Sequence, residues 1–156
     1  MSTSPTAYQI EARVVRPGVS AAASKQAVIE FDTSAGQSEV LPGPADLLTI
    51  AFAACVLKNV ERFSRILPFR YQEASIKVEA ERQEAPPKMI HITYTLQLVT
   101  DEPKHRVDLL HRNIRQHGTI YNTLAATCDV SGEVVAVECL RASSSTPRRF
   151  GSWIVE

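Results

Sequence analysis

The sequence predicts an α+β fold in which mainly antiparallel sheets surround central buried helices. Three observations lead to this prediction. Residues Gly43–Phe63 form a long helical pattern that is apolar through Leu47–Leu57 except at Thr49. Residues Met89–Thr100 alternate between apolar and polar side chains, and helical spacing returns from Lys104 onward. The predicted order is two strands, a helix, two strands, two helices and a final strand.

Two strands are expected before the long helix, at Ala7–Val15 and Lys25–Thr33. β-branched residues are frequent in both, and Arg16-Pro17-Gly18 offers turn chemistry between them. The following stretch, Ser34–Pro44, is rich in glycine, serine and proline, and it is expected to connect the strands to the helix.

The apolar helix is expected to lie at the centre of the protein. Pro44 suits the first helical turn, and Asp46 places negative charge at the positive end of the helix dipole. Every residue in Leu47–Leu57 except Thr49 is apolar, and a helix without a polar face must be covered by protein on nearly all sides. About eleven residues at about 1.5 Å each reach only half of a bilayer, so a membrane span is not expected. One small sheet cannot cover such a helix, so a second helix or a second subunit is required.

The alternating segment forms a predicted antiparallel hairpin with Glu73–Arg82, and Pro86-Pro87 lies between the two strands. Its apolar side chains all fall on one face: Ile90, Ile92, Tyr94, Leu96 and Leu98. The other face is expected to be exposed to water.

The remaining predicted elements are a helix that ends at Gly118, a short helix from Ile120 to about Ala126, and a strand at Glu133–Leu140. Gly118 is expected to end its helix in the left-handed conformation that glycine favours. Residues 1–141 are interpreted as one domain. Residues 142–156 form a C-terminal tail that is either loose or docks its aromatic side chains on a partner subunit.

Composition excludes several classes of function. The chain of 156 residues has 17 basic and 17 acidic side chains, which argues against a general nucleic-acid-binding or membrane-surface role. The segment MSTSPTAYQ lacks the basic and apolar regions of a secretory signal. Three cysteines without close pairing fit a reducing compartment better than a disulfide framework. A cytoplasmic protein is therefore expected.

Cysteine is the residue type most able to carry chemistry in this chain, although free cysteines are commonly inert core residues. Cys55, Cys128 and Cys139 show no C-x-x-C spacing, so no metal site is expected. Four histidines are present, but none is selected as the partner of a catalytic thiol. The sequence has no phosphate loop or cofactor fingerprint, so no cofactor is expected.

The stretch Gly43-Pro44-Ala45-Asp46-Leu47-Leu48, followed by Ala51-Phe52-Ala53-Ala54-Cys55, resembles the central helix of the OsmC family. These are the osmotically inducible and organic hydroperoxide resistance proteins. The strands, the hairpin after the helix and the later pair of helices occur in the same order along the chain as in this family. The resemblance implies an OsmC-like fold and an intertwined homodimer, in which both subunits bury each central helix and thiol sites lie at the interface.

The resemblance also implies a redox chemistry. Cys55 matches the peroxidatic cysteine, which attacks a hydroperoxide O–O bond, becomes a sulfenic acid, and is captured by a second cysteine as a disulfide that an external thiol reduces. Arg16 matches the arginine whose charge favours the thiolate and binds the developing oxyanion; the alternative is an arginine solvated in a turn, and Arg13 and Lys25 are further candidates. In the family, a glutamate after the proline that starts the helix helps to orient this arginine toward the thiolate; the matching position here is Ala45.

Two registers compete for the second cysteine. Cys128-Asp129-Val130-Ser131 looks like the family's Cys-Pro-Val-Ser, but that motif opens a short helix and is followed by Asn-Ala-Leu. The segment with that placement here is Gly118-Thr119-Ile120-Tyr121-Asn122-Thr123-Leu124. The second register is preferred, and under it Gly118 replaces the resolving cysteine.

Two functions follow from this reading. One is a thiol-dependent hydroperoxide reductase of the oxidative stress response, with Cys55 as its single peroxidatic cysteine, Arg16 as its electrostatic partner and an external thiol as reductant. The alternative is a non-catalytic protein that binds a small hydrophobic ligand at the dimer interface, with Phe52 and Tyr121 as walls beside Gly118.

Overall fold

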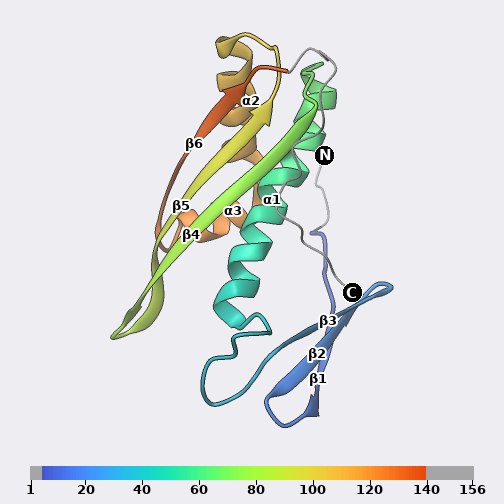
Figure 1. The fold of residues 1–156 in the computed structure, drawn as a ribbon, viewed down its shortest axis with the longest axis vertical. Helices are drawn as coiled ribbons and strands as arrows, with labels where there is room; N and C mark the ends of the chain where they lie inside the picture. Colours follow the sequence, from blue (N-terminus) through green and yellow to red (C-terminus); the bar gives the residue numbers. More distant parts are fainter. Residues whose placement is uncertain (1–4, 140–156) are drawn as a thin grey trace, which may run out of the picture.

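The computed structural model describes residues 5–139, which form six strands and three helices (Figure 1). The strands are β1 (Glu11–Arg16), β2 (Val19–Ser24), β3 (Ala27–Asp32), β4 (Glu73–Glu84), β5 (Pro87–Val99) and β6 (Asp129–Val137). The helices are α1 (Pro44–Ile66), α2 (Lys104–His117) and α3 (Thr119–Ala125). The α+β class predicted from the sequence is confirmed, while the predicted tail at 142–156 lies outside the described residues.

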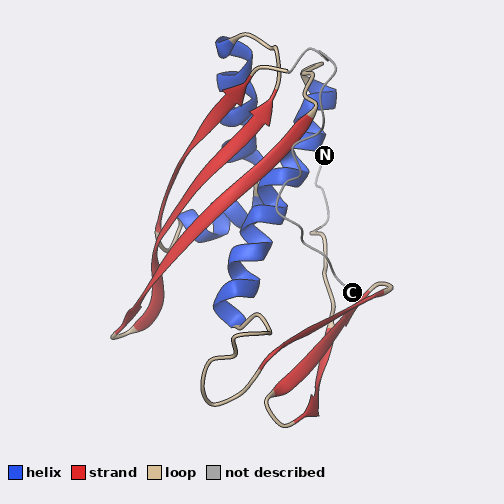
Figure 2. Cartoon of the chain, in the orientation of Figure 1, coloured by secondary structure: helices blue, strands red, loops and turns tan. Residues whose placement is uncertain are grey.

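Strands β1, β2 and β3 form a small antiparallel sheet in that order. Figure 2 shows this sheet standing apart from the rest of the chain, connected to α1 by the loop at 33–43. The sequence predicted only two strands here and missed β2. That strand contains Ala21-Ala22-Ala23, and alanine has a low preference for strands, so its pairing with two neighbours holds it in the sheet.

Strands β4, β5 and β6 form the second sheet, with β5 in the centre. The predicted antiparallel hairpin of β4 and β5 is confirmed. Strand β6 pairs with β5 in parallel and begins at Asp129, four residues before the predicted start at Glu133. A parallel neighbour needs a long crossover, and α2 with α3 supplies it.

The main core lies between this sheet and the three helices, which cover one of its faces (Figure 1). Its fully buried side chains come from α1, β5 and α2: Phe52, Val56, Val60, Leu96, Leu98, Leu110 and Ile114. The inward residues of β5 are those that the alternating pattern predicted, and between them the exposed Thr93 lies on the opposite face.

Helix α1 is covered only on the side that faces this core. Ile50 is 55% exposed, and Ala54, one turn further on, is also exposed. The small sheet leaves Val14 and Val28 largely exposed as well. Monomeric proteins seldom leave contiguous apolar surface in water, so one chain does not complete the burial that the sequence of α1 demands.

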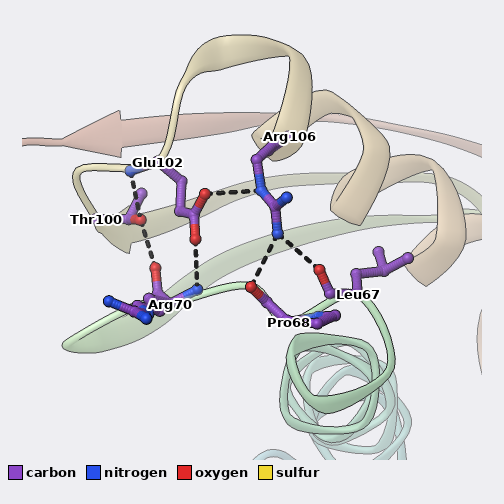
Figure 3. Close-up of polar contacts among 6 residues, drawn as sticks. All are labelled: Leu67, Pro68, Arg70, Thr100, Glu102 and Arg106. Atoms are coloured by element: carbon purple, nitrogen blue, oxygen red, sulfur yellow. Dashed lines mark hydrogen bonds and ion pairs between the residues drawn. The ribbon is translucent and has the colours of Figure 1, made fainter.

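Arg106 ties the end of α1 to the start of α2 (Figure 3). Its Nη2 donates hydrogen bonds to the carbonyl oxygens of Leu67 at 2.6 Å and Pro68 at 2.8 Å. Its Nε lies 2.7 Å from Glu102 Oε2, and Glu102 Oε1 accepts a hydrogen bond from the backbone N–H of Arg70 at 2.9 Å. Carbonyls beyond the last helical turn lack helical partners, so the guanidinium satisfies groups that the fold would otherwise leave unpaired.

Among residues 5–139, the structure has no helix that combines the length and the apolar character needed to cross a membrane.

Gly132 provides a test of the parallel pairing. It lies opposite Tyr94 in the β5–β6 register, and a Cβ at position 132 would be 2.3 Å from Tyr94 Cδ1. Gly132→Ala is therefore expected to lower the free energy of unfolding by about 1–3 kcal/mol through overpacking, measured by urea denaturation. Gly36→Ala is the control, because nothing lies within 4 Å of its added Cβ. Equal stability of the two variants would contradict the register.

Candidate functional site

Cys55 lies at the midpoint of α1 and is half-buried. It is one turn from the fully buried Phe52 and adjacent in sequence to the fully buried Val56, whereas the preceding Ala54 is exposed. The thiol therefore stands at the border between the core and the uncovered side of α1. The Cys55 side chain is therefore partly shielded from water.

Asn59, one turn beyond Cys55, is the polar side chain that approaches the sulfur. Residues four apart share one face of a helix, and the Asn59 Nδ2 lies 4.0 Å from the Cys55 Sγ, at the outer limit for a hydrogen bond to sulfur. Asn59 is only 7% exposed. Sequence analysis missed this residue, although an uncharged amide four positions after the candidate thiol was a usable signal.

Gly118 joins α2 to α3 and is buried. Its φ of −78° and ψ of 111° are extended, so the expected left-handed helix stop is wrong. Space explains the glycine instead, because a Cβ here would lie 2.8 Å from Tyr121 Cβ and 3.0 Å from the Ile114 carbonyl oxygen. The same point is 3.4 Å from Asn59 Nδ2. Gly118 thus opens the short helix α3 and lies against the residue that contacts Cys55.

Arg16 ends β1, and its Nη1 lies 3.6 Å from Glu30 Oε1 on β3. Both side chains are exposed, and exposed ion pairs of this kind contribute little stability. Within the described part of the chain, the small sheet and α1 are not packed together (Figure 1). One chain therefore does not bring Arg16 to the Cys55 sulfur.

The first turn of α1 has no carboxylate that is free to assist the Cys55 thiol. Ala45, where the resemblance implies a glutamate in related proteins, is exposed. Asp46 Oδ2 accepts a hydrogen bond of 2.8 Å from the Gly43 backbone N–H, so this carboxylate caps the helix, as its place near the helix dipole suggested.

An aromatic cluster lies next to Cys55 on the core side of α1. The ring centroid of Phe52 is 5.5 Å from that of Tyr94 and 5.7 Å from that of Tyr121. At its edges, Tyr94 Oη and His111 Nε2 form a hydrogen bond of 2.7 Å, and Arg115 Nε donates to Tyr121 Oη at 2.9 Å. Phe52 thus belongs to the core of a single chain.

Burial controls the protonation of this cluster. It raises the pKa of Tyr94, with the neighbouring Tyr121 adding to the effect. It lowers the pKa of His111, and the positive charge of Arg115 acts in the same direction. Both groups are neutral at neutral pH.

A hollow of about 480 Å³ opens beside Tyr121. Its lining consists mainly of polar and charged residues, namely Asp108, His111, Arg112, Arg115 and Gln116. Of the three residues predicted to form an apolar pocket, Tyr121 reaches this hollow, whereas Phe52 and Gly118 are buried elsewhere in the core.

The other two thiols have local partners. Cys128 Sγ lies 3.2 Å from the Leu124 carbonyl oxygen, to which it donates. Partial burial and the negative charge of Asp101 raise the pKa of the Cys139 thiol, which disfavours the nucleophilic thiolate. Within residues 5–139, no group of three or more histidine, cysteine or acidic side chains is arranged to hold a metal ion.

The model of a protein family described as "OsmC-like protein" matches residues 36–133. This range includes all of α1, the β4–β5 hairpin, α2, α3 and the start of β6. The sequence has no significant match among curated proteins.

Solved structures share the fold at low sequence identity. An OsmC-like protein from Mycoplasma pneumoniae has a TM-score of 0.78 and 17% identity, over 85% of this chain and 98% of that one. An organic hydroperoxide resistance protein from Legionella pneumophila has a TM-score of 0.66 and 14% identity, over 85% and 98%. The organic hydroperoxide resistance protein OhrB of Bacillus subtilis has a TM-score of 0.61 and 16% identity, over 82% and 98%.

The lowered pKa of His111 predicts a specific pH dependence of stability. Below the ordinary value of 6.5, the unfolded chain takes up a proton at this position more readily than the folded chain does. Stability due to neutral His111 is therefore complete above about pH 6.5 and is lost as the pH falls below it. In urea denaturation between pH 7.5 and 5, the wild type is expected to lose more stability than His111→Gln, which cannot titrate. Parallel curves for the two proteins would contradict this assignment.

Proposed function

The chain belongs to the OsmC-like protein family, and on this premise we propose that it reduces organic hydroperoxides with Cys55 as its single peroxidatic cysteine. The observation that supports this function is the half-buried thiol at the midpoint of α1, which has a buried amide beside it. Two proteins of the same fold are named organic hydroperoxide resistance proteins. The proposal extends that activity to this chain.

The proposed reaction has three steps. The Cys55 thiolate attacks one oxygen of the hydroperoxide, an S–O bond forms, the O–O bond breaks, and the departing alkoxide takes a proton to become an alcohol. An external small thiol then attacks the sulfenic acid, which releases water and leaves a mixed disulfide. A second thiol molecule restores Cys55 and leaves as an external disulfide. Each cycle thus consumes one hydroperoxide and two thiols.

Arg16 is the proposed electrostatic partner of the thiolate. A guanidinium close to the sulfur would favour its charged form and the oxyanion that develops on the peroxide. In one chain Arg16 pairs with Glu30. This ion pair is weak and exposed, so Arg16 can leave it to interact with the thiolate. Association of two chains would have to bring the guanidinium to the thiol.

Homodimer formation is part of the proposal. The exposed side of α1 around Ile50 and the exposed valines of the small sheet are two apolar surfaces that one chain leaves uncovered. In an intertwined dimer, the small sheet of one subunit would pack on the partner and both subunits would bury α1. A cytoplasmic location is proposed because the reaction draws on a reduced thiol pool.

The alternative function is non-catalytic ligand binding. It is favoured by the absence of a free carboxylate at Ala45 and Asp46, and by Gly118, which provides no sulfur to resolve a sulfenic acid. Under this alternative the space beside Cys55 at the dimer interface holds a small hydrophobic ligand, and the thiol is not oxidised during function.

Trapping the oxidised sulfur distinguishes the two functions. The protein is treated with one equivalent of cumene hydroperoxide in the presence of dimedone, and the modified residue is identified by mass spectrometry. If the protein is a reductase, dimedone is expected to label the Cys55 sulfenic acid in the wild type and in Cys128→Ser, and to give no label at this position in Cys55→Ser. An unmodified Cys55 would rule out the reductase. A Cys55–Cys128 disulfide would instead overturn the assignment of Gly118 to the resolving position.

A second prediction concerns the dimer. Analytical ultracentrifugation of the wild type is expected to give about twice the mass of the 17.2 kDa chain. Ile50→Asp places a charge on the uncovered side of α1 and is expected to shift the protein to monomer at micromolar concentration, because burying an unpaired charge is costly. Ser131→Asp, on the exposed polar face of β6, is the control and is expected to remain dimeric. A monomeric wild type would refute the dimer.

A further inference from the structure

The Asn59 side chain is a buried polar group whose Nδ2 is directed at the Cys55 sulfur. Asn59 is 7% exposed, and its Nδ2 donates toward the Cys55 Sγ over 4.0 Å. A buried amide without a partner lowers stability, so packing alone would not explain an asparagine at this position. The sulfur is a weak acceptor as a thiol and a stronger one when it carries negative charge.

Gly118 lies beside the Asn59 amide at the junction of α2 and α3. The point that a Cβ at 118 would occupy is 3.4 Å from Asn59 Nδ2. A side chain at 118 would also press on Tyr121 Cβ at 2.8 Å. The distance to Asn59 is an ordinary van der Waals contact, so the close approach of Tyr121 is what requires a glycine at 118, while the amide lies between this backbone and the sulfur.

We propose that Asn59 is a positioning residue for Cys55, which holds the sulfur in its thiolate and sulfenate forms through the amide N–H. The sulfenate part of this proposal rests on the proposed hydroperoxide reductase function. The thiolate part rests only on the geometry of Asn59 and Cys55. An N–H donor in a partly dehydrated site stabilises a charged acceptor more than a neutral one. The hydrogen bond is therefore expected to shorten when Cys55 loses its proton.

In this arrangement the oxidised Cys55 sulfur is held by a hydrogen bond from Asn59 and is not captured by a second cysteine as a disulfide. A second cysteine would attack the sulfenic sulfur, form an S–S bond and release water. An amide cannot do this, so the sulfenate oxygen stays on Cys55 until an external thiol attacks the sulfur. Asn59 thus suits a cycle in which the reductant for the sulfenic acid comes from solution.

The first arm of the test needs no peroxide. In a background of Cys128→Ser and Cys139→Ser, the alkylation rate of Cys55 by iodoacetamide is measured from pH 5 to 10. Asn59→Leu, which has a similar size but no donor, is expected to react at least about fivefold more slowly at pH 7 and to reach its half-maximal rate at higher pH. Asn59→Asp should be slower still, because its carboxylate repels the thiolate. Asn59→Gln should regain part of the rate.

Ser64→Ala is the matched control for this arm. Ser64 is a buried polar residue on the same helix, and its hydroxyl donates to the Glu61 carbonyl oxygen at 2.8 Å, away from the thiol. Its alkylation profile should equal that of the background protein. Circular dichroism confirms that each variant is folded, and the isosteric Asn59→Asp provides the comparison if Asn59→Leu does not fold. Alkylation of a folded donor-free variant at the background rate overturns the proposal.

The second arm measures the lifetime of the sulfenate. After one equivalent of cumene hydroperoxide, dimedone is added at increasing delays and the adduct on Cys55 is quantified. The sulfenate of Asn59→Leu is expected to disappear at least about threefold faster than in the background protein, with more sulfinic acid. Equal lifetimes overturn the sulfenate part of the proposal. If no sulfenate forms in the background protein, the reductase function fails, while the alkylation arm still decides the effect of Asn59 on the thiolate.

Discussion

The burial of α1 is the physical constraint on which the rest of this structure depends. One side of the helix packs on β4, α2 and α3, and on that side Phe52 and Val56 are fully buried in the core. The other side, around Ile50, faces water in a single chain. The small sheet β1–β3 has the same deficit, since its valines find no cover. Two uncovered apolar surfaces in one chain are the physical reason to expect that two chains complete each other.

The position of the thiol follows from the same constraint. Cys55 lies where the buried side of α1 meets the uncovered side, so its environment depends on packing at both. On the core side, the Asn59 amide lies near both the sulfur and the backbone at Gly118, where α2 meets α3.

Elements that are specified by a pattern of neighbouring residues were predicted well from the sequence. Elements that depend on distant partners were not. The β4–β5 hairpin was predictable because alternation in β5 directly reflects a sheet with one buried face. Strand β2 was not, since its alanines carry no strand signal and its two neighbours hold it in place. The parallel pairing of β6 with β5 depends on the crossover through α2 and α3, and the residues of β6 by themselves do not indicate the direction of pairing.

By itself the sequence determined the α+β class, the central helix and the place of Cys55 on it, because hydrophobic period, turn residues and a motif are properties of contiguous residues. The tertiary structure alone decided that Arg16 pairs with Glu30 and that the Asn59 amide lies near both the Cys55 sulfur and the Gly118 backbone. These contacts depend on side-chain direction and on which segments meet. The physical reason is that a polar side chain acquires its role from the groups that surround it after burial.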